Sequence, residues 1–170
     1  MKILVLNCGS SSVKYKVYEV DSVNQELASG MVERIGTKNA DLKCSCCFAH
    51  DPRCAARMFG EPGKLDVPDH RAAVNMICDL LKSDHCIAVK GIEDIAGIGH
   101  RVVHGGEEFA ESVLIDDDVI EGIARCARLA PLHNPPALLG IRACAEIFSG
   151  KPQAAVFDTA FHRTIPEKAY

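Results

Sequence analysis

The chain has 170 residues, of which 48% are hydrophobic and 25% charged, and its formal net charge is −4. This size and composition are typical of one globular domain with a core of its own. The negative charge and the lack of a basic run exclude nucleic-acid binding, which needs clustered Lys and Arg, and the apolar runs are too short for a signal peptide or a membrane span.

The N-terminal segment is predicted to form a β-hairpin. Lys2 to Leu6 is a short apolar run, and Val13 to Val20 alternates apolar and polar residues, as strands do. The turn between them can bind an anion, because Gly9 lets the backbone approach closely, the serines at 10–12 offer hydroxyl donors and Lys14 adds a positive charge. A solvated turn is the alternative, because Gly and Ser favour turns in general.

The next third of the chain mixes one strand, a loop-rich segment and a helix. Glu26 to Ile35 is predicted to be a third strand. Lys38 to Lys64 is punctuated by Gly, Pro and Cys, so we expect loops there. Asp69 to Ser83 has apolar residues at helical spacing behind an Asp cap, which predicts a helix.

The chain contains nine cysteines. An odd number without a secretory signal indicates reduced thiols and a cytoplasmic protein. Cys44, Cys46, Cys47 and Cys54 lie near His50, and Cys and His are the ligands of zinc. Their spacing lacks the paired C-x2-C of a strong zinc motif, so reduced surface cysteines are favoured and a metal or redox module is the alternative.

A strand is predicted from Ile95 to Val103. Alternation places Arg101 and Val103 on one face, with His100 and Val102 on the other. A guanidinium fork beside an apolar side chain suits a small carboxylic acid, since Arg can hold the carboxylate while Val103 packs against a short alkyl tail. The alternative for Arg101 is a structural ion pair at the end of a strand.

Two helices and a strand are predicted to follow. Asp116 to Leu129 begins with acidic residues and ends with basic ones, which suits the helix dipole. Asn134 is expected to cap a helix that runs to about Ser149, with Pro135 in its first turn and Gly150 just past its end. Gln153 to Asp158 is predicted to be a short buried strand that closes with a carboxylate.

Four segments resemble the acetate kinases, within the acetate and sugar kinase, Hsp70 and actin superfamily. They occur in the family's order and are Asn7–Tyr15 (NCGSSSVKY), Gly99–Phe109 (GHRVVHGGEEF), Ala130–Pro135 (APLHNP) and Ala155–His162 (AVFDTAFH). The resemblance implies an α/β fold: a ribonuclease-H-like (actin-like ATPase) domain with a mixed sheet opened by a β-hairpin and flanked by helices.

The resemblance covers the first of two such domains that the family contains. It implies that residues 1–170 form a single N-terminal domain, and that the C-terminal nucleotide-binding domain is absent. The last residues, from Pro166, lack a helix stop or Gly cap, so we expect a fragment. Because the second half of the active site would be missing, we expect the fragment to be inactive alone. A homodimer is expected for the full-length protein.

The activity implied by the resemblance is reversible phosphoryl transfer between ATP and acetate, with Mg²⁺, giving acetyl phosphate and ADP. The residues that match the family's functional positions fall into four sets. They are Asp158, Arg101 and His133 for catalysis; Asn7, Gly9, Ser10, Ser11, Ser12 and Lys14 for the phosphates; Arg101, Val103 and Leu132 for the substrate; and Asn7 and Asp158 for the metal ion.

The resemblance labels Asp158 as a proton donor or acceptor, but the chemistry argues against this role. A small carboxylic acid has a pKa near the Glu reference of about 4.3, so it is already ionised at neutral pH and needs no general base. We therefore expect Asp158 mainly to hold Mg²⁺, with Asn7 as the second ligand. Plainer roles remain open: Asp158 as a cap of the following turn, and His133 as a solvated loop residue.

Other positions in these motifs carry weaker expectations. Cys8 stands where the family usually has a small apolar residue, so it is either a small hydrophobe or a reactive thiol near Lys14. His100, His104 and His162 receive no role, because packing or backbone hydrogen bonds would account for them.

Two other functions are weighed against acetate kinase. In the related propionate kinases the residue at the position of Val103 tends to be smaller, so acetate is favoured over propionate. A non-catalytic nucleotide-binding module would need the hairpin but not Arg101, His133 and Asp158, all of which are present.

Overall fold

The computed structural model describes residues 1–21, 24–46, 54–83 and 89–169. Over these residues the protein is an α/β domain built on an eight-stranded mixed sheet, in the order β5-β4-β3-β2-β1-β6-β8-β7. The strands are β1 (Lys2–Cys8), β2 (Ser12–Glu19), β3 (Gln25–Glu33), β4 (Thr37–Cys46), β5 (Leu65–Val67), β6 (Ile95–Val102), β7 (Val113–Leu114) and β8 (Gln153–Phe157). The predicted hairpin, the predicted third strand, and the strands predicted from Ile95 and from Gln153 are thus confirmed.

The centre of the sheet combines the hairpin with two parallel strands. β1 and β2 are antiparallel, with Cys8 opposite Val13 at the turn. β6 runs parallel to β1, and β8 runs parallel to β6. The carboxyl ends of β1, β6 and β8 therefore lie at one edge, the usual place for a binding site in such a sheet.

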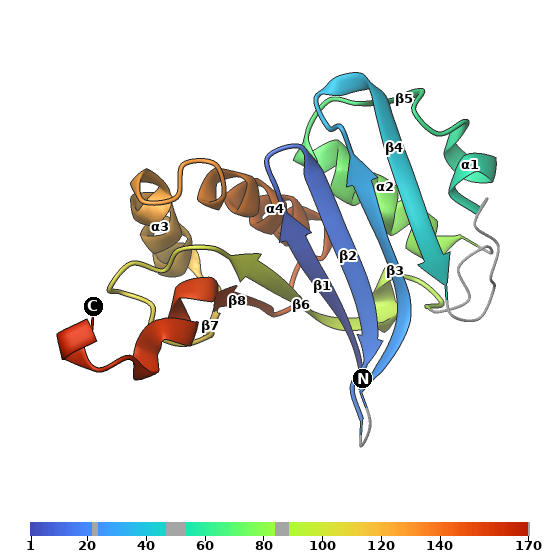
Figure 1. Ribbon diagram of the computed structural model, residues 1–170. Coiled ribbons are helices and arrows are strands. Elements are labelled where there is room, and N and C mark those ends of the chain that lie inside the picture. The colour runs from blue at the N-terminus through green and yellow to red at the C-terminus, as the bar shows by residue number, and fades with distance from the viewer. Residues whose placement is uncertain (22–23, 47–53, 84–88, 170) are drawn as a thin grey trace.

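Helices cover one face of the sheet. The α-helices are α1 (Cys54–Phe59), α2 (His70–Lys82), α3 (Asp117–Arg125) and α4 (Asn134–Ile147), and the 3-10 helices are η1 (Ile92–Asp94), η2 (Cys126–Arg128), η3 (Asp158–Thr164) and η4 (Glu167–Ala169). α2 and α4 pack against each other and against β1, β2 and β6, and Figure 1 shows both behind the strands.

The face opposite α2 and α4 is called the open face below. It carries Val5 and Asn7 of β1, together with Lys14 and Lys16, the partners of these two residues on β2. Leu4, Leu6 and Cys8 of β1 are buried on the helix-covered side. Asn7 and Lys14 of the predicted phosphate site thus share one face with Arg101, which is exposed on β6.

The core divides into a large cluster and a smaller one. The large cluster lies between β1 to β5 and α2, and includes Leu4, Val17, Ile77 and Leu81. The smaller cluster joins α3 and α4 to β8, and contains a stacked aromatic pair of Phe109 and Phe157 with ring centroids 4.8 Å apart. The smaller cluster packs against β8, the strand that directly precedes Asp158.

The predicted helix starts are correct in one case and wrong in another. Asp69 caps α2, and its Oδ1 accepts a hydrogen bond of 2.7 Å from the Ala72 amide. Asn134 does not cap α4: the cap position belongs to His133, whose side chain makes no capping bond. The side-chain amide of Asn134 instead forms hydrogen bonds with His104, in the loop after β6.

The helix predicted from Asp116 is shorter than expected. Asp116 caps α3, which ends at Arg125, and the last turn to Arg128 is the 3-10 helix η2. Gly150 has a φ of 78° just past α4, as its predicted position requires.

The segment from Lys38 to Lys64 is more regular than predicted. It contains most of β4 and all of α1, and β5 follows directly. β4 pairs with β3, where Val32 lies opposite Leu42, and its Ala40 and Leu42 are buried. The polar composition of β4 does not predict a strand, because β4 is stabilised by its pairing with β3 and not by local propensity.

The cysteines behave in two ways. Cys8, Cys78, Cys126 and Cys144 are buried free thiols, in agreement with the expectation. Cys44 is disulfide-bonded, so the expectation of reduced thiols is wrong at that residue. Cys47 and His50 lie outside the described residues, as do the side chains of Cys46 and Cys54.

Across the described part of the chain, each helix is too short or too polar to span a bilayer.

Candidate active site

The site is assembled from the ends of three neighbouring strands. Asn7 lies near the end of β1, Arg101 near the end of β6, and Asp158 directly after β8. Arg101 is paired in register with Val156 of β8, and Leu6 of β1 with His100 of β6. The parallel arrangement therefore brings together side chains that lie up to 151 positions apart in the sequence, from 7 to 158.

Arg101 connects the other two residues. Its Nε lies 2.9 Å and 3.1 Å from the two oxygens of Asp158, and its Nη2 lies 2.6 Å from Oδ2. Its Nη1 donates a longer bond of 3.4 Å to Oδ1 of Asn7. The hydrogen bond with Asp158 raises the pKa of Arg101, so the guanidinium stays charged. The ion pair named above as the alternative for Arg101 is thus present.

The turn of the hairpin is closed tightly and held from outside. The Gly9 amide donates to the Ser12 carbonyl at 2.7 Å, and a Cβ on Gly9 would stand only 3.0 Å from Ser12 Oγ. The Ile35 amide donates to the Ser11 carbonyl at 3.0 Å. The Gly9 carbonyl accepts from Nε2 of His70 at 2.7 Å. Two other segments of the chain, at Ile35 and His70, therefore hold this short turn from outside.

A cavity of about 260 Å³ collects most of the predicted site residues. Its lining comes from the hairpin, the end of β6 and the start of α4, and consists of Asn7, Cys8, Gly9, Ser10, Ser12, Lys14, Arg101, Val103 and His133. Hydroxyl, ammonium and guanidinium groups thus surround one space, together with a single aliphatic side chain.

Three predicted residues do not line this cavity. Ser11 is exposed on the turn, and Leu132 is 68% exposed beside His133. Asp158 contacts the cavity only through Arg101. Of the two residues expected to receive a short alkyl tail, the structure therefore brings Val103 to the cavity but not Leu132.

The buried side-chain amide of Asn134 fixes the part of the cavity lining formed by Val103 and His133. Asn134 is fully buried, its Oδ1 accepts from the His104 amide at 3.2 Å, and its Nδ2 donates to the His104 carbonyl at 2.9 Å. This link ties the loop after β6 to the start of α4, so that Val103 and His133 line the same cavity. Thr159 adds a second link, since its Oγ1 accepts from the Gly105 amide at 3.1 Å.

Sequence reasoning missed the supporting roles of Asn134, Thr159 and His70. The signal for Asn134 was its place in the His-Asn-Pro-Pro motif, which is equally typical of a helix cap. His70 had no signal, because its contact with Gly9 spans 61 residues.

Two of the three histidines without an assigned role, His100 and His104, have the structural roles expected of them. The buried ring of His100 contacts Gln153 Oε1 at 2.6 Å, and burial lowers its pKa to about 4. His104 Nδ1 accepts from the Gly106 amide at 2.9 Å.

Cys8 is a small buried hydrophobe and not a reactive thiol. Burial raises its pKa to about 12, which keeps it protonated. Its Sγ occupies the space that a side chain on Gly140 of α4 would need. The close approach of α4 to β1 thus depends on both residues.

The donors for a metal ion are few. Within the described residues, no group of three or more His, Cys, Asp and Glu is placed to bind one. Asn7 and Asp158 offer an amide oxygen and a carboxylate on either side of Arg101. This set fits Mg²⁺, which commonly takes one or two carboxylates and completes its shell with phosphate oxygens and water.

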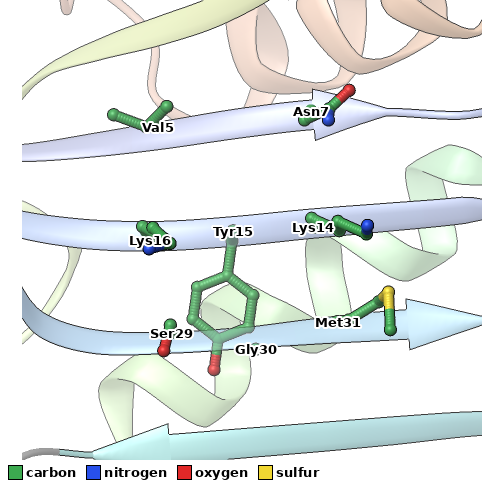
Figure 2. A pocket seen from close by; sticks show the side chains of 8 residues that line it. All are labelled: Val5, Asn7, Lys14, Tyr15, Lys16, Ser29, Gly30 and Met31. Carbon is green, nitrogen blue, oxygen red and sulfur yellow. The ribbon is translucent and has the colours of Figure 1, made fainter.

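A second hollow of about 380 Å³ lies beside the first on the open face. Figure 2 shows its lining: Val5 and Asn7, Lys14 and Lys16, and Ser29, Gly30 and Met31, with the ring of Tyr15 lying across Gly30. A Cβ on Gly30 would overlap that ring. The two hollows share Asn7 and Lys14, but only the smaller one contains Arg101 and His133.

Comparisons with known proteins agree on one family. A model described as the acetokinase family matches residues 2–170. An acetate kinase of Desulfitobacterium hafniense (strain DSM 10664 / DCB-2) is 48% identical over 170 residues, covering 100% of this chain and 40% of that protein. An acetate kinase of Natranaerobius thermophilus is 48% identical over 172 residues, with the same coverage.

Solved structures give the same result. The crystal structure of Porphyromonas gingivalis acetate kinase matches with a TM-score of 0.86 and 43% identity, covering 99% of this chain and 40% of that one. A propionate kinase from Francisella tularensis matches with a TM-score of 0.80 and 42% identity, covering 98% and 39%. These likenesses confirm the expected actin-like ATPase fold, and the chain spans about two fifths of the length of these relatives.

Proposed function

This chain belongs to the acetokinase family, and on that premise we propose that it supplies the phosphate hairpin and the carboxylate site of an acetate kinase. The reaction is reversible phosphoryl transfer between ATP and acetate, giving acetyl phosphate and ADP. Because the chain covers 40% of its relatives, we propose that residues 1–170 form the first domain, and that a second domain supplies the nucleoside contacts.

One observation carries this proposal: Arg101 already grips a carboxylate beside a phosphate-binding turn. Its Nε and Nη2 hold the two oxygens of Asp158, in the bidentate geometry that an acetate ion would also accept. The same cavity contains Lys14 and the turn at Gly9. A site for a carboxylate and a site for a phosphate thus open on one space.

The transfer needs positioning and charge stabilisation more than proton transfer. A carboxylate oxygen of acetate attacks the terminal phosphorus of ATP, and the bond from that phosphorus to the bridging oxygen breaks with its electron pair going to ADP. Lys14 holds the terminal phosphate, Arg101 orients acetate and neutralises phosphoryl oxygens, and His133 donates to the same oxygens. Val103 packs against the methyl group.

We assign Mg²⁺ to Asn7 and Asp158. Their oxygens are of the type that Mg²⁺ prefers; Asn7 lines the cavity, and Asp158 is linked to it through Arg101. The ion supplies charge that neutralises the phosphates. Because acetate is ionised at neutral pH, Asp158 has no proton to remove and serves to hold cations, Arg101 among them.

Propionate is the second candidate substrate. A propionate kinase is among the similar structures, at 42% identity. Acetate is favoured because Val103, the aliphatic side chain of the cavity, narrows the space for a longer tail. We expect Val103→Ala to raise kcat/KM for propionate relative to acetate by about tenfold, since one methylene in an apolar pocket is worth roughly 1–3 kcal/mol.

The test measures acetyl phosphate, trapped with hydroxylamine, from acetate and Mg·ATP. It uses this chain and, separately, the same chain joined to the C-terminal portion of the Desulfitobacterium relative, called the joined chain below. We expect product from the joined chain and none from the 170 residues alone. Arg101→Ala in the joined chain should abolish the product.

The other outcomes discriminate between functions. A joined chain that folds and binds Mg·ATP without forming product would indicate the non-catalytic nucleotide-binding module. Product from the 170 residues alone would contradict the assignment of essential contacts to a second domain. We also propose a homodimer and a cytoplasmic location, as in the family, and sedimentation of the joined chain tests the dimer.

A further inference from the structure

His70 contacts the phosphate turn but does not line the phosphate cavity. It is the first residue of α2 and only 6% exposed, and its Nε2 lies 2.7 Å from the Gly9 carbonyl oxygen. A carbonyl oxygen can only accept, so Nε2 carries the hydrogen. This residue lies outside the four segments that carry the family motifs.

The hydrogen bond fixes the orientation of one peptide group. The Gly9 carbonyl and the Ser10 amide belong to the same peptide, and the described chain has no cis peptide bonds, so the two groups point in opposite directions. His70 lines a separate cavity of about 280 Å³ between α2 and α4, whereas Gly9 and Ser10 line the phosphate cavity. With its carbonyl directed to His70, the peptide therefore presents the Ser10 amide to the phosphate cavity.

Without this hydrogen bond the peptide group between Gly9 and Ser10 could adopt another orientation. Gly9 lacks a Cβ, so the backbone can rotate there at little cost and turn the carbonyl toward the cavity. A carbonyl oxygen in that place would repel phosphate, where an amide would bind it. His70 is itself held firmly, because Asp69 caps the helix that it begins.

We propose that His70 is a positioning residue for phosphate binding: its Nε2 hydrogen bond to Gly9 holds the Ser10 amide toward the terminal phosphate of ATP. The proposal rests on the function proposed above, since it assumes that this turn binds the nucleotide phosphates. His70 itself does not contact the phosphate.

Two substitutions separate this role from simple packing. His70→Gln keeps an N–H donor four bonds from Cα, the same number as Nε2 in His. His70→Asn keeps a side-chain amide but is one bond shorter and cannot reach Gly9. Val74 lies in the same helix and is fully buried. Val74→Ala removes packing of α2 without changing the turn, so it serves as the control for lost stability.

The experiment is a titration of the ¹⁵N-labelled joined chain with Mg·ATP, followed at the Ser10 amide resonance, because the joined chain also carries the second domain that supplies the nucleoside contacts. The joined chain with His70 unchanged is called the native chain in this experiment, and each variant is made in the same joined chain. We expect the native chain to shift and saturate, His70→Gln to bind within about threefold of it, and His70→Asn to bind about tenfold more weakly, the effect of one lost hydrogen bond. Val74→Ala should lower the melting temperature and leave binding unchanged. Nitrogen shifts of the native His70 ring should show hydrogen on Nε2.

The outcomes that overturn the proposal differ from those that overturn the function. If the native chain binds while His70→Asn binds equally well, or His70→Gln binds as poorly as His70→Asn, His70 does not position the turn. An Nε2 without hydrogen in the native chain would also contradict the proposal, as would a Val74→Ala loss equal to that of His70→Asn. If Mg·ATP leaves Ser10 of the native chain unmoved, the phosphate site itself is wrong and this inference falls with it.

Discussion

At the scale of single residues, the ion pair between Arg101 and Asp158 unites two interpretations that the sequence kept apart. Their side chains are 48% and 40% exposed, so the pair adds at most about 1 kcal/mol to stability. Its effect is on geometry: Asp158 holds the guanidinium in the plane that a second carboxylate would need. A structural ion pair and a substrate clamp are therefore compatible uses of the same arginine.

Replacing Asp158 tests whether it transfers a proton. In the joined chain, we expect Asp158→Asn to lower kcat at least tenfold and to weaken Mg²⁺ affinity, because a neutral amide holds cations less well. The shape of the pH–rate profile should not change, since acetate needs no general base.

Rates between pH 5 and 9, together with the Mg²⁺ dependence, decide the matter. An Asp158→Asn enzyme with native Mg²⁺ affinity, in which the only loss is a titration seen in the native profile, would show that Asp158 is a proton carrier. Glu108→Gln, at a carboxylate that pairs with Arg125 and does not line the cavity, is the control.

His100 should make the stability of the protein depend on pH. Burial lowers its pKa to about 4, whereas the unfolded chain has the reference value of 6.5. As pH falls from 6.5 to 4, the unfolded state takes up a proton that the folded state refuses, so stability decreases through that window, by on the order of 3 kcal/mol. Above pH 6.5 this contribution is constant.

Urea unfolding at several pH values measures this effect, with His100→Gln as the reference. The stability difference between native chain and variant should shrink as pH falls through the window, because the variant lacks the titrating ring. A difference that stays constant from pH 7 to pH 4 would contradict the lowered pKa.

At the scale of elements, α4 reaches β1 only because Gly140 faces Cys8. A Cβ on Gly140 would overlap Cys8 Sγ, while the Cys8 Cβ would stand 3.5 Å away, an ordinary contact. We expect Gly140→Ala to destabilise the native chain by about 1–3 kcal/mol through overpacking. In a Cys8→Ala background the same change should be neutral or stabilising, because Ala favours a helix over Gly by about 1 kcal/mol.

The four chains of this double-mutant cycle can be compared by denaturant unfolding. Equal effects of Gly140→Ala in both backgrounds would mean that Cys8 is not the obstacle. Ala145→Gly, at an exposed position of the same helix, gives the cost of a helical Gly without the contact.

Elements with strong local signals were predictable, and those fixed by distant partners were not. The hairpin and α2 follow from alternation, spacing and the cap at Asp69. β4 was missed because its polar residues are held by pairing with β3. In the candidate site, the motif residues Asn7, Lys14, Arg101 and Val103 meet as expected, whereas Leu132 does not join them. The support from His70 crosses 61 residues and leaves no trace in local sequence.

At the scale of the whole molecule, the sheet is covered on one side and ends in an apolar edge. β7 is the last strand of the sheet, and its Leu114 is 72% exposed. An edge strand with an exposed apolar side chain favours pairing with another molecule. We expect Leu114→Lys to reduce concentration-dependent self-association of the 170-residue chain, as measured by sedimentation velocity.

Leu139→Lys is the matched control, since Leu139 is 49% exposed on α4 and lies away from the sheet edge. It adds the same charge, so an equal reduction in both variants would assign the effect to net charge and not to the edge.

The two outside anchors of the hairpin turn, Ile35 and His70, also bear on the thermodynamics of binding. Ile35 and His70 hold the carbonyls of Ser11 and Gly9 whether or not a phosphate is present, and the Gly9 amide closes the turn onto Ser12. The conformational entropy of this loop is therefore lost when the domain folds and not when ATP arrives. Calorimetry should accordingly find that phosphate binding orders little backbone, and that loosening either anchor makes the binding entropy less favourable.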